Sequence, residues 1–204
     1  MAYNKLLSAD EILKVAVQMV EQGEADGLSL RAVAAELGVK APSLYRYFAD
    51  KGTLELAVAE EALRRMRGEL EPAAALADPK ARVMAAAKAY LRFTREHYAL
   101  YSYVFQGRVR EAYGSREGKA VWNTLLDAVS EVTGTPDDTA STVAIWSFLH
   151  GYATLEHAGG FGASGPHGAL ELGLNSLLNN SHQTSTPSQA ERRAKASGNR
   201  RKKR

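Results

Sequence analysis

The sequence predicts an all-α protein, and three observations support this prediction. The 204 residues include 34 Ala and 23 Leu but only two Ile, a composition that favours helices over strands. Apolar residues recur at helical spacing along most of the chain, and no segment shows the alternation of a half-buried strand. The prolines fall at the starts of helical patterns or between them, so that none interrupts a predicted helix. We expect about nine helices.

The first 71 residues contain signals for four helices. The third of these, at 41–48, is the shortest, and the fourth extends to residue 70. Small polar residues precede the helices as N-caps, and glycines end the first two. The predicted caps and stops are, in chain order, Ser8 with Glu11, Gly23, Ser29, Gly38 and Asp50.

The region 71–180 predicts further helices that are longer and more apolar. The first starts at Asp78-Pro79 and leads into an aromatic stretch at 97–105, after which Gly107 and Gly114 bracket a loop. Three further helical patterns follow: one ends at Gly134, one covers 136–158 and one covers 167–179. Pro72 and Pro166 lie between helices. Leu149, Leu170, Leu174 and Leu177 on the last two helices make apolar faces too wide for one small domain, which predicts a dimer interface.

Charge is distributed unevenly along the chain. Residues 190–204 contain eight Lys or Arg and one Glu, whereas the remaining residues carry 18 basic and 22 acidic side chains. The basic pI therefore describes a tail and gives no evidence for nucleic-acid binding by the folded body. We expect an arm at 1–7, a first domain at 8–70, a second domain at 71–180 and a disordered basic tail at 181–204.

Several classes of protein are excluded by what the sequence lacks. Without cysteine there is no disulfide framework, thiolate nucleophile or Cys-ligated metal. No apolar run approaches the roughly 20 residues of a membrane span, and the N-terminal residues lack the apolar centre of a secretory signal. We therefore expect a cytoplasmic protein.

Two short helices joined at Gly38 have the outline of a helix-turn-helix at 29–48. A recognition helix needs small side chains where its backbone enters the major groove and hydrogen-bond donors on its flanks for phosphate. Leu44 and Phe48 would face inward with Val33 and Leu37. The predicted DNA contacts are Ser29, Arg31, Lys40, Ala41, Pro42, Ser43, Tyr45, Arg46, Tyr47 and Lys51.

Residues 11–63 resemble the N-terminal domain of the TetR (tetracycline-repressor-like) transcriptional regulators. The residues that support this resemblance are Gly23, Ser29-Leu30, Val33-Ala34, Gly38-Val39, Leu44 to Phe48, Lys51 and Leu54. The resemblance implies an all-helical homodimer whose third helix enters the major groove of a palindromic operator. It also implies that Tyr45 and Tyr47 touch the DNA backbone and that Lys51 approaches phosphate. The turn at Gly23-Glu24-Ala25-Asp26 departs from the family pattern.

The C-terminal half is similar to a regulatory domain found in part of the same family, through Trp146, His150-Gly151, Leu155-Glu156 and Gly160-Phe161. This similarity implies a ligand-binding and dimerisation domain. Its aromatic residues either fill a core or line a cavity, and both alternatives remain open. Four tyrosines within residues 90–103 offer hydroxyls that a core would have to satisfy. The predicted binding residues for a small apolar or aromatic effector are Tyr90, Phe93, Tyr101, Phe105, Trp122, Trp146 and His150.

Two other functions compete with a ligand-responsive repressor. An enzyme would have to use His97, His150, His157 and Glu156, which lack a nucleophile and an orienting residue at suitable spacing. Two imidazoles seven residues apart on a helix are separated by about 10 Å, too far for one zinc ion, so we expect no metal and no cofactor. The second competitor is a non-specific architectural DNA binder that uses the basic tail.

Overall fold

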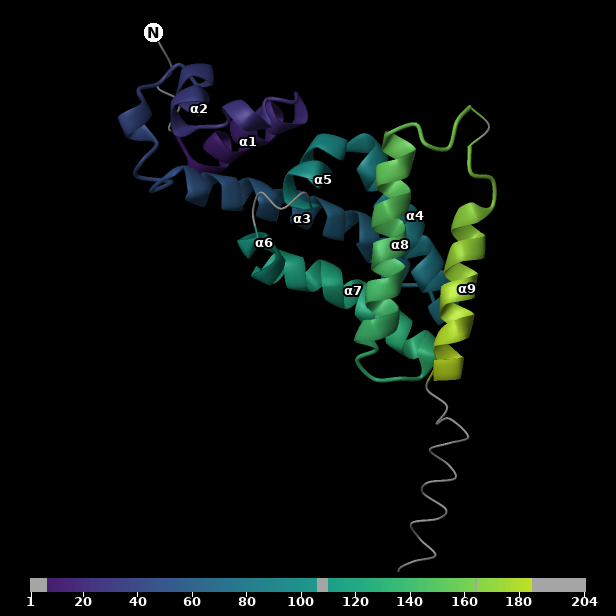
Figure 1. Ribbon diagram of the computed structural model, residues 1–204. Helices are drawn as coiled ribbons and strands as arrows, with labels where there is room; N and C mark the ends of the chain where they lie inside the picture. Colours follow the sequence, from purple (N-terminus) through teal and green to yellow (C-terminus); the bar gives the residue numbers. More distant parts are fainter. Residues whose placement is uncertain (1–6, 106–109, 164, 185–204) are drawn as a thin grey trace, which may run out of the picture.

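The computed structural model describes residues 7–105, 110–163 and 165–184, and every regular element in these ranges is helical (Figure 1). This confirms the predicted all-α fold. The α-helices are α1 (Ala9–Glu21), α2 (Leu30–Glu36), α3 (Lys51–Ala74), α4 (Pro79–Glu96), α5 (Tyr98–Phe105), α6 (Glu111–Gly114), α7 (Arg116–Thr133), α8 (Thr139–His157) and α9 (Ala169–Thr184). Two short 3-10 helices cover Ala25–Gly27 and Ala41–Ser43.

The first hydrophobic core lies where α1, α2 and the start of α3 meet (Figure 1). Ser8, Ser29 and Asp50 accept hydrogen bonds from backbone N–H groups in the first turns of α1, α2 and α3, which confirms the three predicted N-caps. Leu44 and Val33 are fully buried in this core. The same core also takes Leu100, Tyr103 and Val104 from α5, so residues beyond 71 help to form it.

The predicted helix at 41–48 is wrong in its form. Only Ala41–Ser43 is a regular turn, of 3-10 type, and hydrogen-bonded turns follow it up to Tyr47. The N–H groups of Ser43 and Leu44 donate to carbonyls three residues back, and the N–H of Phe48 donates four residues back. A segment this short gains too few i→i−4 bonds to offset the cost of starting an α-helix, and 3-10 geometry is common in such short pieces.

Helix α3 extends from the first core into a second one (Figure 1). Leu54, Val58 and Leu63 belong to the first core, whereas Met66 and Leu70 belong to the second. Pro72 lies inside this helix and not between helices, contrary to the prediction. Because Ala73 is buried in the second core, tertiary packing holds the last turn despite the missing N–H of Pro72.

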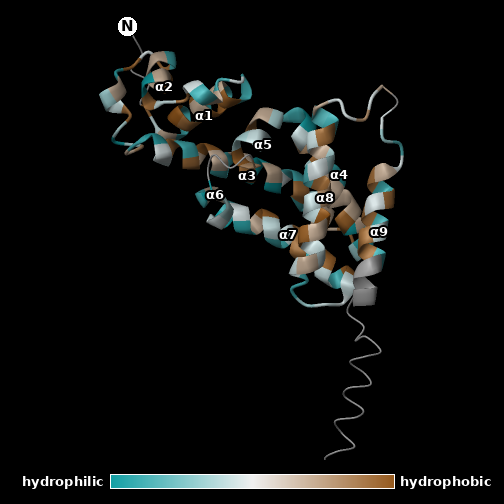
Figure 2. Cartoon of the chain, viewed as in Figure 1, coloured by the Kyte–Doolittle hydropathy of each residue, from teal (hydrophilic) through white to brown (hydrophobic). Residues whose placement is uncertain are grey.

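The second core is formed by the rest of α3 together with α4, α7, α8 and α9. Helices α8 and α9 lie side by side at one end of the molecule, and α1 and α2 lie at the other (Figure 1). Brown, hydrophobic residues concentrate where the helices face one another, and teal residues face outward (Figure 2). At Gly173 of α9 a Cβ atom would lie 2.3 Å from the ring of Phe148 on α8, so glycine permits the close approach of these helices.

Three boundaries in the second half differ from the predictions. Helix α8 starts at Thr139 with Asp138 as its N-cap, because Asp137 has a positive φ of 52° and Pro136 lies in the preceding turn. Residues 111–114 form the short helix α6 inside the predicted loop. Helix α9 continues to Thr184, past the predicted end of the fold at 180. The basic tail lies outside the described residues.

The leucines predicted to form a dimer interface mostly belong to the core of the single chain. Leu149, Leu170 and Leu174 are 2%, 8% and 0% exposed, because α7 and α4 cover the inner faces of α8 and α9. Exposed apolar side chains on these two helices are Val143, Leu155 and Leu172, with exposed fractions of 43%, 53% and 71%. Among the described residues, no helix has the length and apolarity needed to cross a bilayer.

Two glycines with open space around them should respond oppositely to the same substitution. Gly38, after α2, has a φ of +66° and nothing within 4 Å of the position that a Cβ atom would take, whereas exposed Gly68 lies inside α3 with equally open surroundings. Gly38→Ala should lower the free energy of unfolding by about 1–2 kcal/mol, because the left-handed region disfavours a Cβ atom. Gly68→Ala should raise it by about 0.5–1 kcal/mol by improving helix propensity. Urea unfolding measures both, and changes of the same sign would contradict the explanation.

Candidate nucleic-acid interface and cavity

The segment 40–47 presents polar side chains to solvent at one end of the molecule, beside α2 (Figure 1). Lys40, Pro42 and Arg46 are exposed, and half of the Tyr45 surface is accessible. The neighbouring Leu44 and Phe48 point the other way, since they are 0% and 6% exposed. The burial of these two residues therefore fixes which side of the segment faces outward, as the sequence predicted.

The other predicted DNA contacts at this end differ from one another in burial and in hydrogen bonding. Ala41 and Ser43 are half-buried. Because their side chains are small, they leave the backbone close to an approaching ligand. The Ser29 hydroxyl accepts a hydrogen bond of 3.1 Å from Ala32 N, which ties it to the start of α2. Arg31, two residues later, is exposed and makes no described ion pair or hydrogen bond.

Tyr47 has an internal partner that the sequence did not reveal. Its hydroxyl donates a hydrogen bond to the carbonyl oxygen of Leu7, just before α1. A phenol has one hydrogen to donate and a phosphate oxygen only accepts, so Tyr47 cannot donate to phosphate while this bond is present. The Arg46 guanidinium lies 5.1 Å from the centre of the Tyr47 ring, within range of a cation–π interaction.

Lys51 is the first residue of α3, where the unpaired N–H groups and the helix dipole favour an anion. Its Nζ atom lies 3.4 Å from the carboxylate of Glu55, and the lysine side chain remains 52% exposed. Because an exposed ion pair of this kind contributes little, Lys51 can exchange it for a phosphate at small cost.

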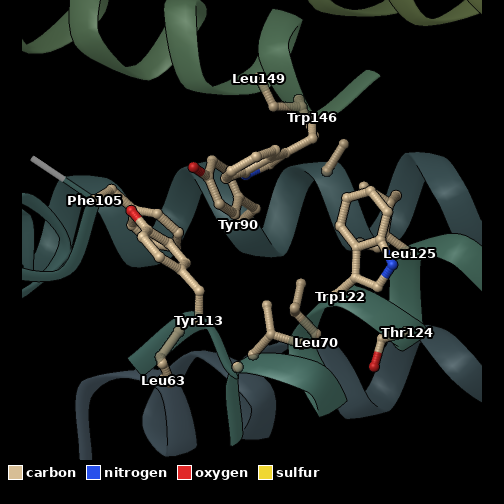
Figure 3. A pocket seen from close by; sticks show the side chains of 14 residues that line it. Leu63, Leu70, Tyr90, Phe105, Tyr113, Trp122, Thr124, Leu125, Trp146 and Leu149 are labelled. Carbon is tan, nitrogen blue, oxygen red and sulfur yellow. The ribbon is translucent and has the colours of Figure 1, made fainter. Parts of the chain in front are cut away.

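A cavity of about 330 Å³ lies between α3, α4, α7 and α8 (Figure 3). Leu63 and Leu70 of α3 lie on one side of it, and Trp146 and Leu149 of α8 lie on the opposite side (Figure 3). Its lining is almost entirely apolar, which is typical of sites for small organic molecules. The lining residues are Leu63, Leu70, Ala86, Ala87, Tyr90, Phe105, Tyr113, Gly118, Val121, Trp122, Thr124, Leu125, Trp146 and Leu149.

Four of the seven residues predicted to bind a ligand line this cavity, namely Tyr90, Phe105, Trp122 and Trp146. Phe93, Tyr101 and His150 do not. Phe93 is buried in the second core and packs near His97, with ring centres 5.2 Å apart. Among the residues that the prediction missed are Tyr113 and Thr124; no signal in the sequence separates them from other surface or core positions.

Tyr101 and His150 form a hydrogen-bonded pair behind the cavity wall. The Tyr101 hydroxyl lies 2.7 Å from His150 Nδ1, and both rings contact Phe105, which lines the cavity. Burial lowers the pKa of His150 and raises the pKa of Tyr101, so both groups are neutral near pH 7. These residues support the wall and are not part of the described lining.

The histidines considered for catalysis have separate partners. His97 pairs with Glu21 at 3.0 Å, His150 with Tyr101, and His157 stacks on the Tyr98 ring. Glu156 forms a bidentate ion pair with Arg95. Among the described residues, no three His, Cys, Asp or Glu side chains gather into a possible metal site.

Comparison with known proteins gives matches for both parts of the chain. Residues 12–58 match the family model described as bacterial regulatory proteins, tetR family, and residues 83–176 match the tetracyclin repressor-like C-terminal domain. A curated relative, the HTH-type transcriptional repressor DrrR1 of Streptomyces coeruleorubidus, is 48% identical over 48 residues. This match covers 24% of the chain and 18% of the relative, so the chain spans about a fifth of the relative's length.

Solved structures share the whole fold. A protein of unknown function from Rhodococcus sp. RHA1 superimposes with a TM-score of 0.70 at 25% identity, covering 90% of this chain and 98% of that one. The TetR family transcriptional regulator PfmR from Thermus thermophilus gives a TM-score of 0.55 at 20% identity, with 81% and 94% covered. With one family model on the helix-turn-helix region and a second on the helical bundle behind it, the chain is similar to tetR family regulators in both of its parts.

Proposed function

We propose that the chain is a sequence-specific DNA-binding transcriptional regulator, and that it acts as a repressor. The observation that supports this most directly is the outward face of segment 40–47, where Lys40, Tyr45 and Arg46 are exposed above a core that holds Leu44. Small residues at Ala41 and Ser43 leave the backbone accessible for the major groove, and flanking donors suit phosphate oxygens.

We further propose that two copies bind a palindromic operator together. Two recognition segments would have to lie about 34–36 Å apart, or a multiple of this distance, to reach successive major grooves. The exposed Leu155 near the end of α8 and Leu172 near the start of α9 supply apolar surface for a second copy. Helices α8 and α9 would then form the interface, at the end of the molecule opposite to α2 (Figure 1).

Release by a small molecule is the third part of the proposal. The cavity is bounded by Leu63 and Leu70 of α3, the same helix that begins with Lys51 at the DNA-facing end. A ligand that prefers one position of α3 therefore changes the spacing of the two recognition segments. A small apolar or aromatic effector fits the lining.

The proposed function is tested by fluorescence anisotropy of the full-length protein with the DNA upstream of its own gene. We expect binding at least a thousandfold tighter than to shuffled DNA of the same length at physiological salt. Deleting residues 190–204 should preserve this ratio. Equal affinity for both DNAs, or loss of selectivity on deletion, would instead support a non-specific architectural binder that uses the tail.

Lys51→Ala should weaken binding to both DNAs by the same factor, because a phosphate contact has no sequence information. The slope of log affinity against log salt concentration should fall in magnitude by about one. Lys80→Ala is the matched control, since Lys80 lies on α4 beside Asn179, and it should change neither quantity. A change in operator preference on substitution of Lys51 would contradict the phosphate assignment.

The dimer is tested by placing charge on the exposed apolar surface of α8 and α9. Leu155→Asp combined with Leu172→Asp should convert a dimer into a monomer at micromolar concentration, because a buried unpaired carboxylate is strongly disfavoured at an interface. Leu76→Asp, at an exposed leucine after α3, provides the control and should leave the dimer intact. Sedimentation velocity measures both, and a double variant that remains dimeric would exclude this surface.

A further inference from the structure

One buried hydroxyl of the cavity lining has no hydrogen-bond partner among the described residues. Tyr90 is 5% exposed and lines the cavity, and its buried hydroxyl makes no hydrogen bond. Tyr101 and Trp146 lie near enough to affect its pKa, but neither reaches hydrogen-bonding geometry. Leaving such a group unpaired in a protein interior is unfavourable, so an orphaned hydroxyl needs an explanation.

The other hydroxyls of the lining are already satisfied. The Tyr113 hydroxyl donates to the carbonyl oxygen of Val104 at 3.2 Å, and the Thr124 hydroxyl donates to that of Ala120 at 3.0 Å. Figure 3 places the Tyr90 ring between the Phe105 and Tyr113 rings on one side and the Trp146 and Trp122 rings on the other. Among the hydroxyls of the lining, that of Tyr90 is therefore the one without a described hydrogen-bond partner.

The lining also limits the charge of an occupant. None of its described residues carries a formal charge. Burial raises the pKa of Tyr90 far above its usual value, so the hydroxyl keeps its proton and acts as a donor. An anion, or a strongly hydrated cation such as a primary ammonium, would lose its hydration without gaining an opposite charge, which is strongly unfavourable.

We propose that the cavity binds an uncharged, mainly apolar molecule with one carbonyl or hydroxyl oxygen, which accepts a hydrogen bond from Tyr90. This inference rests on the proposed release by a small molecule and specifies the chemical class of the effector. Tyr90 selects the oxygen, and the surrounding aromatic rings select the apolar body. At about 330 Å³ the space is at the lower end of the usual range for ligand sites, which favours a compact molecule.

Three probes of similar shape separate these requirements: 4-phenylcyclohexanone, phenylcyclohexane and 4-cyclohexylbenzoate. The two tryptophans of the chain, Trp122 and Trp146, both line the cavity, so tryptophan fluorescence excited at 295 nm reports on this site alone. Titrations use the full-length protein without DNA. We expect both neutral probes to bind, because an apolar cavity of about 150 Å³ already accepts benzene, and we expect no binding of the carboxylate at millimolar concentration.

Tyr90→Phe provides the decisive comparison. The affinity ratio of the ketone to the hydrocarbon should fall about threefold to tenfold in this variant, because one hydrogen bond is lost while the shape is retained. Tyr113→Phe is the matched control: it also removes a lining hydroxyl, but one already bonded to Val104, and it should leave the ratio unchanged. Tyr90→Phe should not lower the free energy of unfolding of the empty protein, since the hydroxyl has no partner to lose.

The possible outcomes distinguish this inference from the proposed function. An unchanged ratio in Tyr90→Phe, comparable binding of the carboxylate, or no binding of either neutral probe would each overturn the assigned ligand class. Operator binding measured by anisotropy would be unaffected by any of these results. Conversely, failure of selective DNA binding with the expected probe ratios would refute the proposed regulator and leave the assigned cavity chemistry standing.

Discussion

Helix α3 belongs to both hydrophobic cores, and the arrangement of the molecule depends on it. Leu54 and Val58 of α3 are buried in the first core, and Met66 and Leu70 are buried in the second. A helix of 24 residues spans about 36 Å, and its proline, Pro72, lies near the C-terminal end, so the helix has no break between the two cores. The position of Lys51 at the start of α3 is therefore coupled mechanically to the packing around Leu70.

Helix α5 provides a second connection between the cores. Leu100 and Tyr103 face the first core, whereas Tyr101 on the same helix faces the second, where its hydroxyl pairs with His150. Outside the cores, ion pairs from α4 reach four different helices: Arg82 to Glu131, Lys88 to Glu171, Arg92 to Glu69 and Arg95 to Glu156. Exposed pairs contribute little stability individually, so buried apolar contacts hold α4 in place and the charges help to fix its register.

Features of the fold that depend on a few neighbouring residues were predictable from the sequence, whereas features that depend on tertiary packing were not. The N-caps Ser8, Ser29 and Asp50 and the left-handed Gly38 depend on a few neighbouring residues, and the structure confirms each. Pro72 inside α3 was missed because burial of Ala73 outweighs the local effect of proline. The leucines of α8 and α9 show the same limit, since helical periodicity identifies an apolar face but does not say whether the chain itself or a second copy covers it.

The same contrast between local patterns and tertiary packing applies to the two candidate sites. The outward face of segment 40–47 follows from the spacing of Leu44 and Phe48, which is a local pattern. The cavity could not be predicted from the sequence, because it depends on three-dimensional packing. Its lining combines residues from α3 to α8 and does not include Tyr101, His150 or Phe93, although these side chains are also aromatic.

A molecule in the cavity would touch the shared helix directly, through Leu63 on the first core and Leu70 on the second. Direct contact alone does not produce regulation, because a ligand with equal affinity for two positions of α3 shifts neither. The coupling must come from a difference in ligand contacts between those positions. Apolar contacts distributed around a wall change little with small displacements of one helix, whereas a hydrogen bond is sensitive to distance and angle. Tyr90 lies on α4, which packs along α3, so the geometry between its hydroxyl and a ligand resting on Leu63 and Leu70 depends on how the two helices lie against each other. A single directional bond is therefore the feature of this apolar cavity best suited to make ligand affinity depend on the position of the helix that begins at Lys51.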